Sequence, residues 1–236
     1  MSLETIRKIL RDRDVTVLAS APLSQEEKKQ VENADALICV NGSISSIPSS
    51  RIPDLWILNS REYDSPIYLN PQRWTETRKH LHETMMQQGA GRKVRHILFL
   101  LKNDSPSQTI ARLKSSGVKW RAHTTLHAGQ KTDLVRSAGV HKFDTAFNTS
   151  AGLTAICVAL KCNPSSVTVC GFSVEGSRSN DYAYISSVPP LTRLHIAQDK
   201  EALSELTAQW GSKLTFLSPL FPVPDLSGLE PTISDH

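Results

Sequence analysis

The chain has little that would place it in a special structural class. It has four cysteines and 11 glycines among 236 residues, and aromatic residues make up 6% of it. No cysteine forms a CxxC pair or stands at metal-ligand spacing from a histidine. We therefore expect Cys39, Cys157, Cys162 and Cys170 to be small buried hydrophobes in a reducing compartment, which favours a cytoplasmic location.

Long apolar runs and an excess of one charge are also missing. No stretch approaches the ~18 apolar residues of a membrane span, and the charged N-terminus MSLETIRKILRDRDV is not a signal peptide. The net charge of +4 is too small to predict nucleic-acid binding, but it suits an anionic ligand. Apolar residues make up 39% and charged residues 21%, which excludes disorder as a description of the whole chain.

Short apolar runs instead alternate with longer stretches of helical character. Most of the runs lack strict alternation, as expected of strands covered on both faces. This rhythm predicts an α/β fold: a single Rossmann-like domain over 1–236 with a mostly parallel, doubly wound sheet. The predicted strands are 15–19, 36–40, 55–58, 96–101, 166–172 and 213–218, and the predicted helices are 24–33, 71–88, 106–116, 131–138, 150–162 and 199–210.

Three stretches interrupt this rhythm. Residues 41–54 have the composition of a polar loop that follows the second strand. Residues 173–198 form a long Gly-, Ser- and Pro-containing segment, which we interpret as a small lid-like loop. Residues 219–236 are rich in proline and are expected to form an extended C-terminal tail.

Ligands of open α/β sheets bind beyond the carboxyl ends of the strands, so the residues that follow each strand are candidates for a site. They are Ser20 after the first strand, Asn41 and Gly42 after the second, Asn59 after the third, Ser173 after the fifth, and the helix start from Thr149 through Ser150 to Gly152. Amides, hydroxyls and a helix N-terminus suit phosphate and sugar hydroxyls better than a metal. A plain helix cap remains the alternative for Thr149 and Ser150.

Common catalytic and nucleotide-binding motifs are absent. The chain has no GxGxxG, no P-loop and no GxSxG. Asp12-Arg13-Asp14 matches the DxD pattern of metal-dependent glycosyltransferases, but it precedes the first strand and so faces the wrong edge of the sheet. We interpret it as a helix end and expect no metal site.

Several segments together resemble the bacterial sialyltransferases of glycosyltransferase family 42 and, more distantly, the animal enzymes of family 29. The segment TSAGLTAICVALKCNPSSVTVCGFSVEGSRSNDYAY (149–184) is similar to the family's helix start, strand ending in glycine, and loop leading to a tyrosine. HIAQDKEALSELTAQWGSKLTFLSP (195–219) resembles its catalytic histidine, following helix and last strand. The collinear set runs from about residue 14 to 219, and Asn41 and Asn59 fall where the family keeps two asparagines.

This resemblance implies roles for individual residues. His195 would be the general base, and Tyr182, with Tyr184, would donate hydrogen bonds to the leaving phosphate. Asn41 and Asn59 would bind cytidine monophosphate, and Thr149 and Ser150 would meet it at a helix N-terminus. The implied nucleotide-binding set is completed by Ser20, Gly42, Gly152, Gly171 and Ser173.

The chain departs from the family pattern at two places. Ala19-Ser20-Ala21-Pro22 stands where the family has a Gly-Asn-Gly type of turn, so one amide contact to the nucleotide is replaced by a hydroxyl. An acid that the family often places after the strand ending at Gly171 is missing, and Phe172 and Ser173 occupy that position.

The resemblance also implies the reaction and the partners. The chain would be an inverting, metal-independent transferase without a cofactor, taking CMP-sialic acid or a related CMP-ulosonic acid such as CMP-Kdo as donor. The acceptor would be a glycan or lipopolysaccharide-type hydroxyl, with no nucleic acid involved; peripheral contact with the inner membrane surface and homo-oligomerisation are left open. Two alternatives stand beside it: a pterin pyrophosphokinase-like enzyme, which would need Mg²⁺ held by carboxylates, and a non-catalytic nucleotide- or sugar-binding domain of the same fold.

Overall fold

The computed structural model describes residues 3–60, 83–84, 86–101, 105–141, 149–173 and 196–217. Its strands are β1 (Asp14–Leu18), β2 (Ala36–Val40), β3 (Leu55–Ser60), β4 (Lys93–Leu101), β5 (Lys119–Leu126), β6 (Ser166–Cys170) and β7 (Leu214–Phe216). Its helices are α1 (Glu4–Leu10), α2 (Gln25–Asn33), α4 (Ser107–Ser115), α5 (Ala128–Ser137), α6 (Ala151–Lys161), α7 (Ile196–Trp210) and the 3₁₀-helix η1 (Asn41–Ser46). Most of the predicted helix 71–88, nearly all of the predicted lid and the predicted tail lie outside the described residues.

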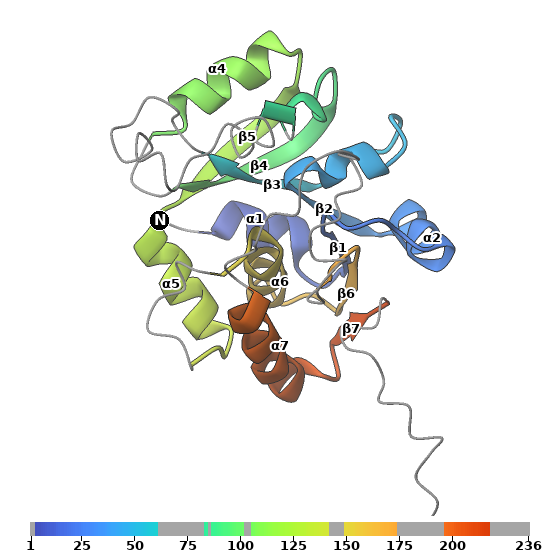
Figure 1. The fold of residues 1–236 in the computed structure, drawn as a ribbon, viewed down its shortest axis with the longest axis vertical. Helices are drawn as coiled ribbons and strands as arrows, with labels where there is room; N and C mark the ends of the chain where they lie inside the picture. The colour runs from blue at the N-terminus through green and yellow to red at the C-terminus, as the bar shows by residue number, and fades with distance from the viewer. Residues whose placement is uncertain are drawn as a thin grey trace, which may run out of the picture.

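The seven strands form one parallel sheet in the order β5-β4-β3-β2-β1-β6-β7 (Figure 1). The chain moves outward from β1 to β5 and then returns to the other side of β1 with β6 and β7. The strand order therefore reverses between β1 and β6, whose last residues, Leu18 and Cys170, are paired. The crevice at such a reversal is where open α/β sheets bind their ligands.

Helices cover both faces of the sheet, as the predicted doubly wound fold requires. On one face of the sheet, the hydrophobic core includes residues of α1, α5, α6 and α7. On the opposite face, it includes residues of α2, η1 and α4. Successive residues of β2 alternate between the two cores, Ile38 in one and Cys39 in the other. All five residues of β2 are buried, which explains why its sequence shows no polar alternation.

The structure adds β5 and η1, which the sequence analysis missed, and the helix α1, of which it predicted only an end at Asp12-Arg13-Asp14. β5 is an edge strand whose residues are mostly exposed or half-buried, so it carries no apolar run. α1 buries only Ile6 and Leu10 of its seven residues. η1 replaces the first part of the expected polar loop 41–54, because Ser43 directs its hydroxyl back to the backbone as described below.

The four cysteines are buried free thiols, as the sequence analysis predicted. Burial raises the pKa of Cys39, Cys157, Cys162 and Cys170 to about 12. These thiols therefore stay protonated near neutral pH and act as small apolar side chains rather than as nucleophiles.

Helix α6 is the central helix of its face. Residues 151–160 are all buried, which fits a helix that is apolar on every side. It packs against β1, β2, β3 and β6 and is flanked by α5 and α7. Among the described residues, no helix is long and apolar enough to cross a membrane.

A buried carboxylate connects the two sides of the strand reversal. Glu27 is 1% exposed, and its Oε2 accepts the N–H of Ser24 (2.8 Å), closing a capping box at the start of α2. Its Oε1 accepts the N–H of Gly171 (2.7 Å), the residue that follows β6. A charge in this position is tolerated because both oxygens have donors.

We expect Glu27→Gln to lower the free energy of unfolding by about 1–3 kcal/mol, because the new amide N–H would face one of the two backbone N–H groups. Urea unfolding measures the change. The matched control is Glu26→Gln on the exposed side of the same helix turn, which should stay within about 0.5 kcal/mol of the parent. Equal stability of the two variants would show that the Glu27 contacts do not hold the fold.

Candidate functional site

The loop after β1 is held against the end of β6 by its backbone. Ala19 donates its N–H to the carbonyl of Cys170 (2.9 Å), and Ala21 donates to the carbonyl of Gly171 (2.8 Å). Gly171 has a φ of 61°, and a Cβ there would lie 2.9 Å from the Ala21 oxygen and 3.0 Å from the Ala19 oxygen. Only glycine fits this crossing, so Gly171 allows the backbone of the loop after β1 to approach the end of β6.

The two asparagines of the predicted site are brought together. Asn41, with a φ of 51°, accepts the Asn59 N–H at its Oδ1 (3.1 Å). The indole of Trp56 donates to the Asn41 carbonyl (2.7 Å) and fixes the backbone. Since Oδ1 is engaged, the Nδ2 amino group of Asn41 is the part of the side chain that can still donate to a ligand.

Hydroxyl groups close the gap between the ends of β1 and β2. Ser43 accepts the Val40 N–H and donates to the Leu18 carbonyl, both at 2.8 Å, and it is fully buried. Ser20 is half-buried and donates to the Val40 carbonyl at 3.3 Å. The Gly42 carbonyl accepts from Ser45 (3.0 Å), and Gly42 is buried. Ser20 and Ser43 therefore use their hydroxyl groups to hold the ends of β1 and β2 together.

The N-terminus of α6 lies at the same edge. The Ser150 hydroxyl accepts the N–H of Leu153 (3.0 Å), so the helix-cap interpretation is correct for this residue. The first N–H groups of the helix have no acceptor within it and carry a partial positive charge. A Cβ on Gly152 would lie 2.6 Å from the ring of Phe172, so a glycine is needed where α6 meets the end of β6.

Two charged side chains hold this helix start from opposite sides. Lys131 of α5 donates its Nζ to the Thr149 carbonyl (2.8 Å). Asp199 of α7, 5% exposed, accepts the Ser150 N–H (3.1 Å). Thr149 itself is 4% exposed. Helices α5, α6 and α7 therefore meet at the two residues that the sequence analysis assigned to a nucleotide.

Most of the predicted site residues gather at one edge of the sheet. Asn41 is hydrogen-bonded to Asn59, and Ser20 is hydrogen-bonded to the last residue of β2. Gly152 lies close to the ring of Phe172, whose neighbours in the sequence are Gly171 and the half-buried Ser173. The three predicted catalytic residues, Tyr182, Tyr184 and His195, lie outside the described residues. Among the residues that the structure describes, no group of three or more His, Cys, Asp or Glu side chains could hold a metal ion.

Sequence reasoning missed three residues of this edge: Glu27, Lys131 and Asp199. Glu27 stands three residues after Ser24, which is the spacing of a capping box and gave a usable local signal. Lys131 and Asp199 carried no such signal, because their partners at Thr149 and Ser150 lie 18 and 49 residues away in the sequence.

No protein-family model and no curated protein sequence matches the chain. Among solved structures, the chain is similar to the sialyltransferase CstII from Campylobacter jejuni in complex with the substrate analogue CMP-3FNeuAc, at 15% identity and a TM-score of 0.45, covering 91% of this chain and 84% of that one. The same sialyltransferase with cytidine-5'-monophosphate matches at 15% identity and a TM-score of 0.47, covering 88% and 81%. Likeness at this level does not carry a function from one chain to another.

We expect Asp199→Ala to loosen the start of α6, because the Ser150 N–H loses its buried acceptor. The free energy of unfolding should fall by about 1–3 kcal/mol, and hydrogen exchange should accelerate in the peptide that contains residues 149–152. Glu201→Ala, at an exposed acid two residues further along the same helix, is the control and should change neither quantity. Unchanged exchange in the Asp199 variant would mean that Asp199 does not hold the helix start.

Proposed function

We propose that the chain is a CMP-sugar-dependent, inverting glycosyltransferase of the sialyltransferase type, transferring sialic acid or a related ulosonic acid to a glycan hydroxyl. The observation that carries the proposal is that the Asn41–Asn59 pair, at the ends of β2 and β3, and the α6 N-terminus lie at the same edge of the sheet as the strand reversal between β1 and β6. Fixed N–H and amide donors of this kind suit a nucleotide monophosphate.

In this proposal, different residues bind the phosphate and the cytidine parts of the nucleotide. The N-terminal N–H groups of α6, braced by Lys131 and Asp199, receive the phosphate, which is favoured there by the helix dipole. The Asn41 Nδ2 group and the Asn59 side chain bind the cytidine part. Ser20 already donates to Val40, so its hydroxyl acts as an acceptor toward the ligand while that hydrogen bond persists.

In the proposed reaction an acceptor hydroxyl attacks the anomeric carbon, and the bond from that carbon to the phosphate oxygen breaks. His195 takes the proton of the hydroxyl, as an imidazole with a pKa near neutrality can. Tyr182, with Tyr184, donates hydrogen bonds to the departing CMP phosphate as its charge grows. His195 directly precedes Ile196, the first residue of α7. Asp199 of α7 binds Ser150 at the carboxyl-end edge of the sheet, which we call the donor edge. This connection supports the placement of the base near the donor.

One observation favours the non-catalytic alternative. The sialyltransferase family that the chain resembles has an amide side chain in the loop after the first strand. This chain has Ser20 there, and its hydroxyl already donates a hydrogen bond within the fold. A domain that lost this contact would bind nucleotide weakly and would show no dependence on His195. No similar observation favours the pyrophosphokinase alternative, whose magnesium ions need carboxylate ligands.

We expect CMP to raise the melting temperature in the presence of EDTA, more than UMP, GMP or ATP does. At 100 times its dissociation constant a ligand stabilises by about 2.7 kcal/mol, which a thermal shift detects readily. Asn41→Asp should keep the fold, since a carboxylate oxygen can still accept the Asn59 N–H and Asp tolerates a positive φ. It replaces the Nδ2 donor with a negative charge, so we expect CMP affinity to fall about tenfold or more.

A control variant separates the site from general effects of charge. Asn163→Asp makes the same substitution at an exposed asparagine with a φ of 56° at the opposite edge, after α6, and should leave CMP affinity unchanged. Stabilisation by ATP that requires Mg²⁺ would favour the pyrophosphokinase, and no shift with any nucleotide would favour the non-catalytic domain.

We expect His195→Ala to lower the transfer rate by about 10²–10⁴-fold with donor affinity preserved, because general base catalysis contributes on that scale. Tyr182→Phe should reduce kcat more than it weakens CMP binding, because its hydrogen bond strengthens as the phosphate leaves. Steady-state kinetics with CMP-sialic acid, combined with CMP titration, separate the two effects. Full activity of His195→Ala would exclude the proposed mechanism.

A further inference from the structure

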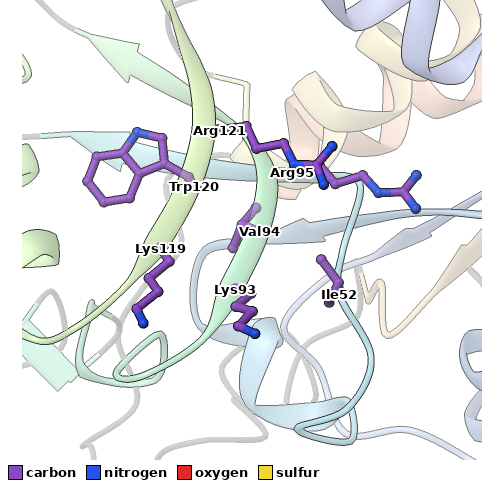
Figure 2. Close-up of a pocket in the computed structure, with 7 residues that line it drawn as sticks. All are labelled: Ile52, Lys93, Val94, Arg95, Lys119, Trp120 and Arg121. Carbon is purple, nitrogen blue, oxygen red and sulfur yellow. The ribbon is translucent and has the colours of Figure 1, made fainter.

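A basic cavity lies at the end of the sheet opposite to the candidate site. Its volume is about 300 Å³, and its lining comes from the first residues of β4 and β5 and from the loop before β3 (Figure 2). The lining residues are Ile52, Lys93, Val94, Arg95, Lys119, Trp120 and Arg121. In Figure 2, Arg95 and Arg121 extend toward the side that carries Ile52, whereas the indole of Trp120 lies on the other side of β5.

Four of these seven residues are cations, and none is acidic. The strand register places Lys93 directly beside Lys119, and Arg95 and Arg121 stand two residues further along the same strands. Like charges on neighbouring strands repel one another, so this arrangement costs stability unless an anion is present. A bound anion would remove this cost.

The acidic residue that pairs with these cations, Asp54, already binds two arginines. The buried carboxylate of Asp54 accepts from Arg95 (2.6 Å) and from Arg13 (3.2 Å), and it also accepts the N–H of Leu37 (3.0 Å). It therefore orients the Arg95 guanidinium without neutralising the cavity. Lys93, Lys119 and Arg121 are exposed, and no ion pair is formed by them among the described residues.

The cavity is separate from the proposed donor site. It lies at the amino ends of β4 and β5, whereas the donor edge is formed at the carboxyl ends of β1, β2 and β3. β4 has nine residues, and at about 3.3 Å per residue it spans roughly 30 Å. A ligand in the cavity would not reach the reacting atoms, so this inference does not depend on the proposed function.

We propose that this cavity binds a ligand carrying two or more phosphate groups. Arginine matches phosphate oxygens with two parallel hydrogen bonds, and lysine adds a point charge. Cavities of about 300 Å³ are at the small end of ligand sites, which fits a compact phosphorylated group better than an extended polymer. The group can belong to a free polyphosphorylated molecule or to a phospholipid headgroup.

Tripolyphosphate is the probe, and its binding is measured by calorimetry on the full chain. We expect saturable binding that weakens as salt is added, and an affinity at least about tenfold lower in the double variant Lys93→Gln/Lys119→Gln. Lys28→Gln/Lys29→Gln removes the same charge from the exposed face of α2 and should stay within about twofold. The melting temperature of the Lys93/Lys119 variant should not fall, since repulsion is removed.

A second arm identifies the source of the phosphate. Cosedimentation with phosphatidylcholine vesicles that contain cardiolipin, whose headgroup carries two phosphates, lost in the Lys93/Lys119 variant and competed by tripolyphosphate, assigns the group to a lipid. Tripolyphosphate binding without cosedimentation assigns it to a free ligand, and both results support the proposal. Equal losses in the two double variants, no saturable binding by the parent chain, or tighter binding of an oligonucleotide than of tripolyphosphate would overturn it. CMP binding serves as a separate readout, because neither double variant touches the donor edge.

Discussion

One buried carboxylate binds both sides of the strand reversal between β1 and β6. Glu27 caps the helix that follows β1 with one oxygen and receives the N–H of Gly171 with the other. The loop after β1 then donates two backbone N–H groups across to Cys170 and Gly171, so backbone hydrogen bonds hold this edge together. A rigid edge of this kind is what a preorganised binding site needs.

Much of this fold could be predicted because its strands are covered on both faces. β1, β2 and β6 have nearly continuous apolar runs, and the predicted strands match them within two residues at each end. β5 could not be found in this way, because an edge strand buries few side chains and its sequence KWRAHTTL resembles a polar connection. Its strand state comes from pairing with β4, which is a tertiary effect that local pattern does not record.

The same distinction explains what could be predicted of the site. The rule that ligands meet the carboxyl ends of strands located Asn41, Asn59 and the α6 start, and the structure brings these to one edge. It could not reveal that the Asn41 oxygen already accepts the Asn59 N–H, so that the amino group is the part of the side chain that donates to a ligand. Nor could it reveal the partnership of Glu27 and Gly171, which are 144 residues apart.

The carboxyl and amino ends of the strands would attract an anion by different means, dipoles at the first and full charges at the second. The edge proposed to bind the donor presents dipoles: helix N–H groups worth about half a charge, together with amides and hydroxyls fixed by their own hydrogen bonds. Such groups gain most when charge develops on a bound phosphate, because they are already oriented and need no rearrangement. The basic cavity instead presents four full charges, which attract an anion at any stage and distinguish little between ground and transition state. The first end is therefore the one suited to the proposed chemistry, and the second is suited to binding alone.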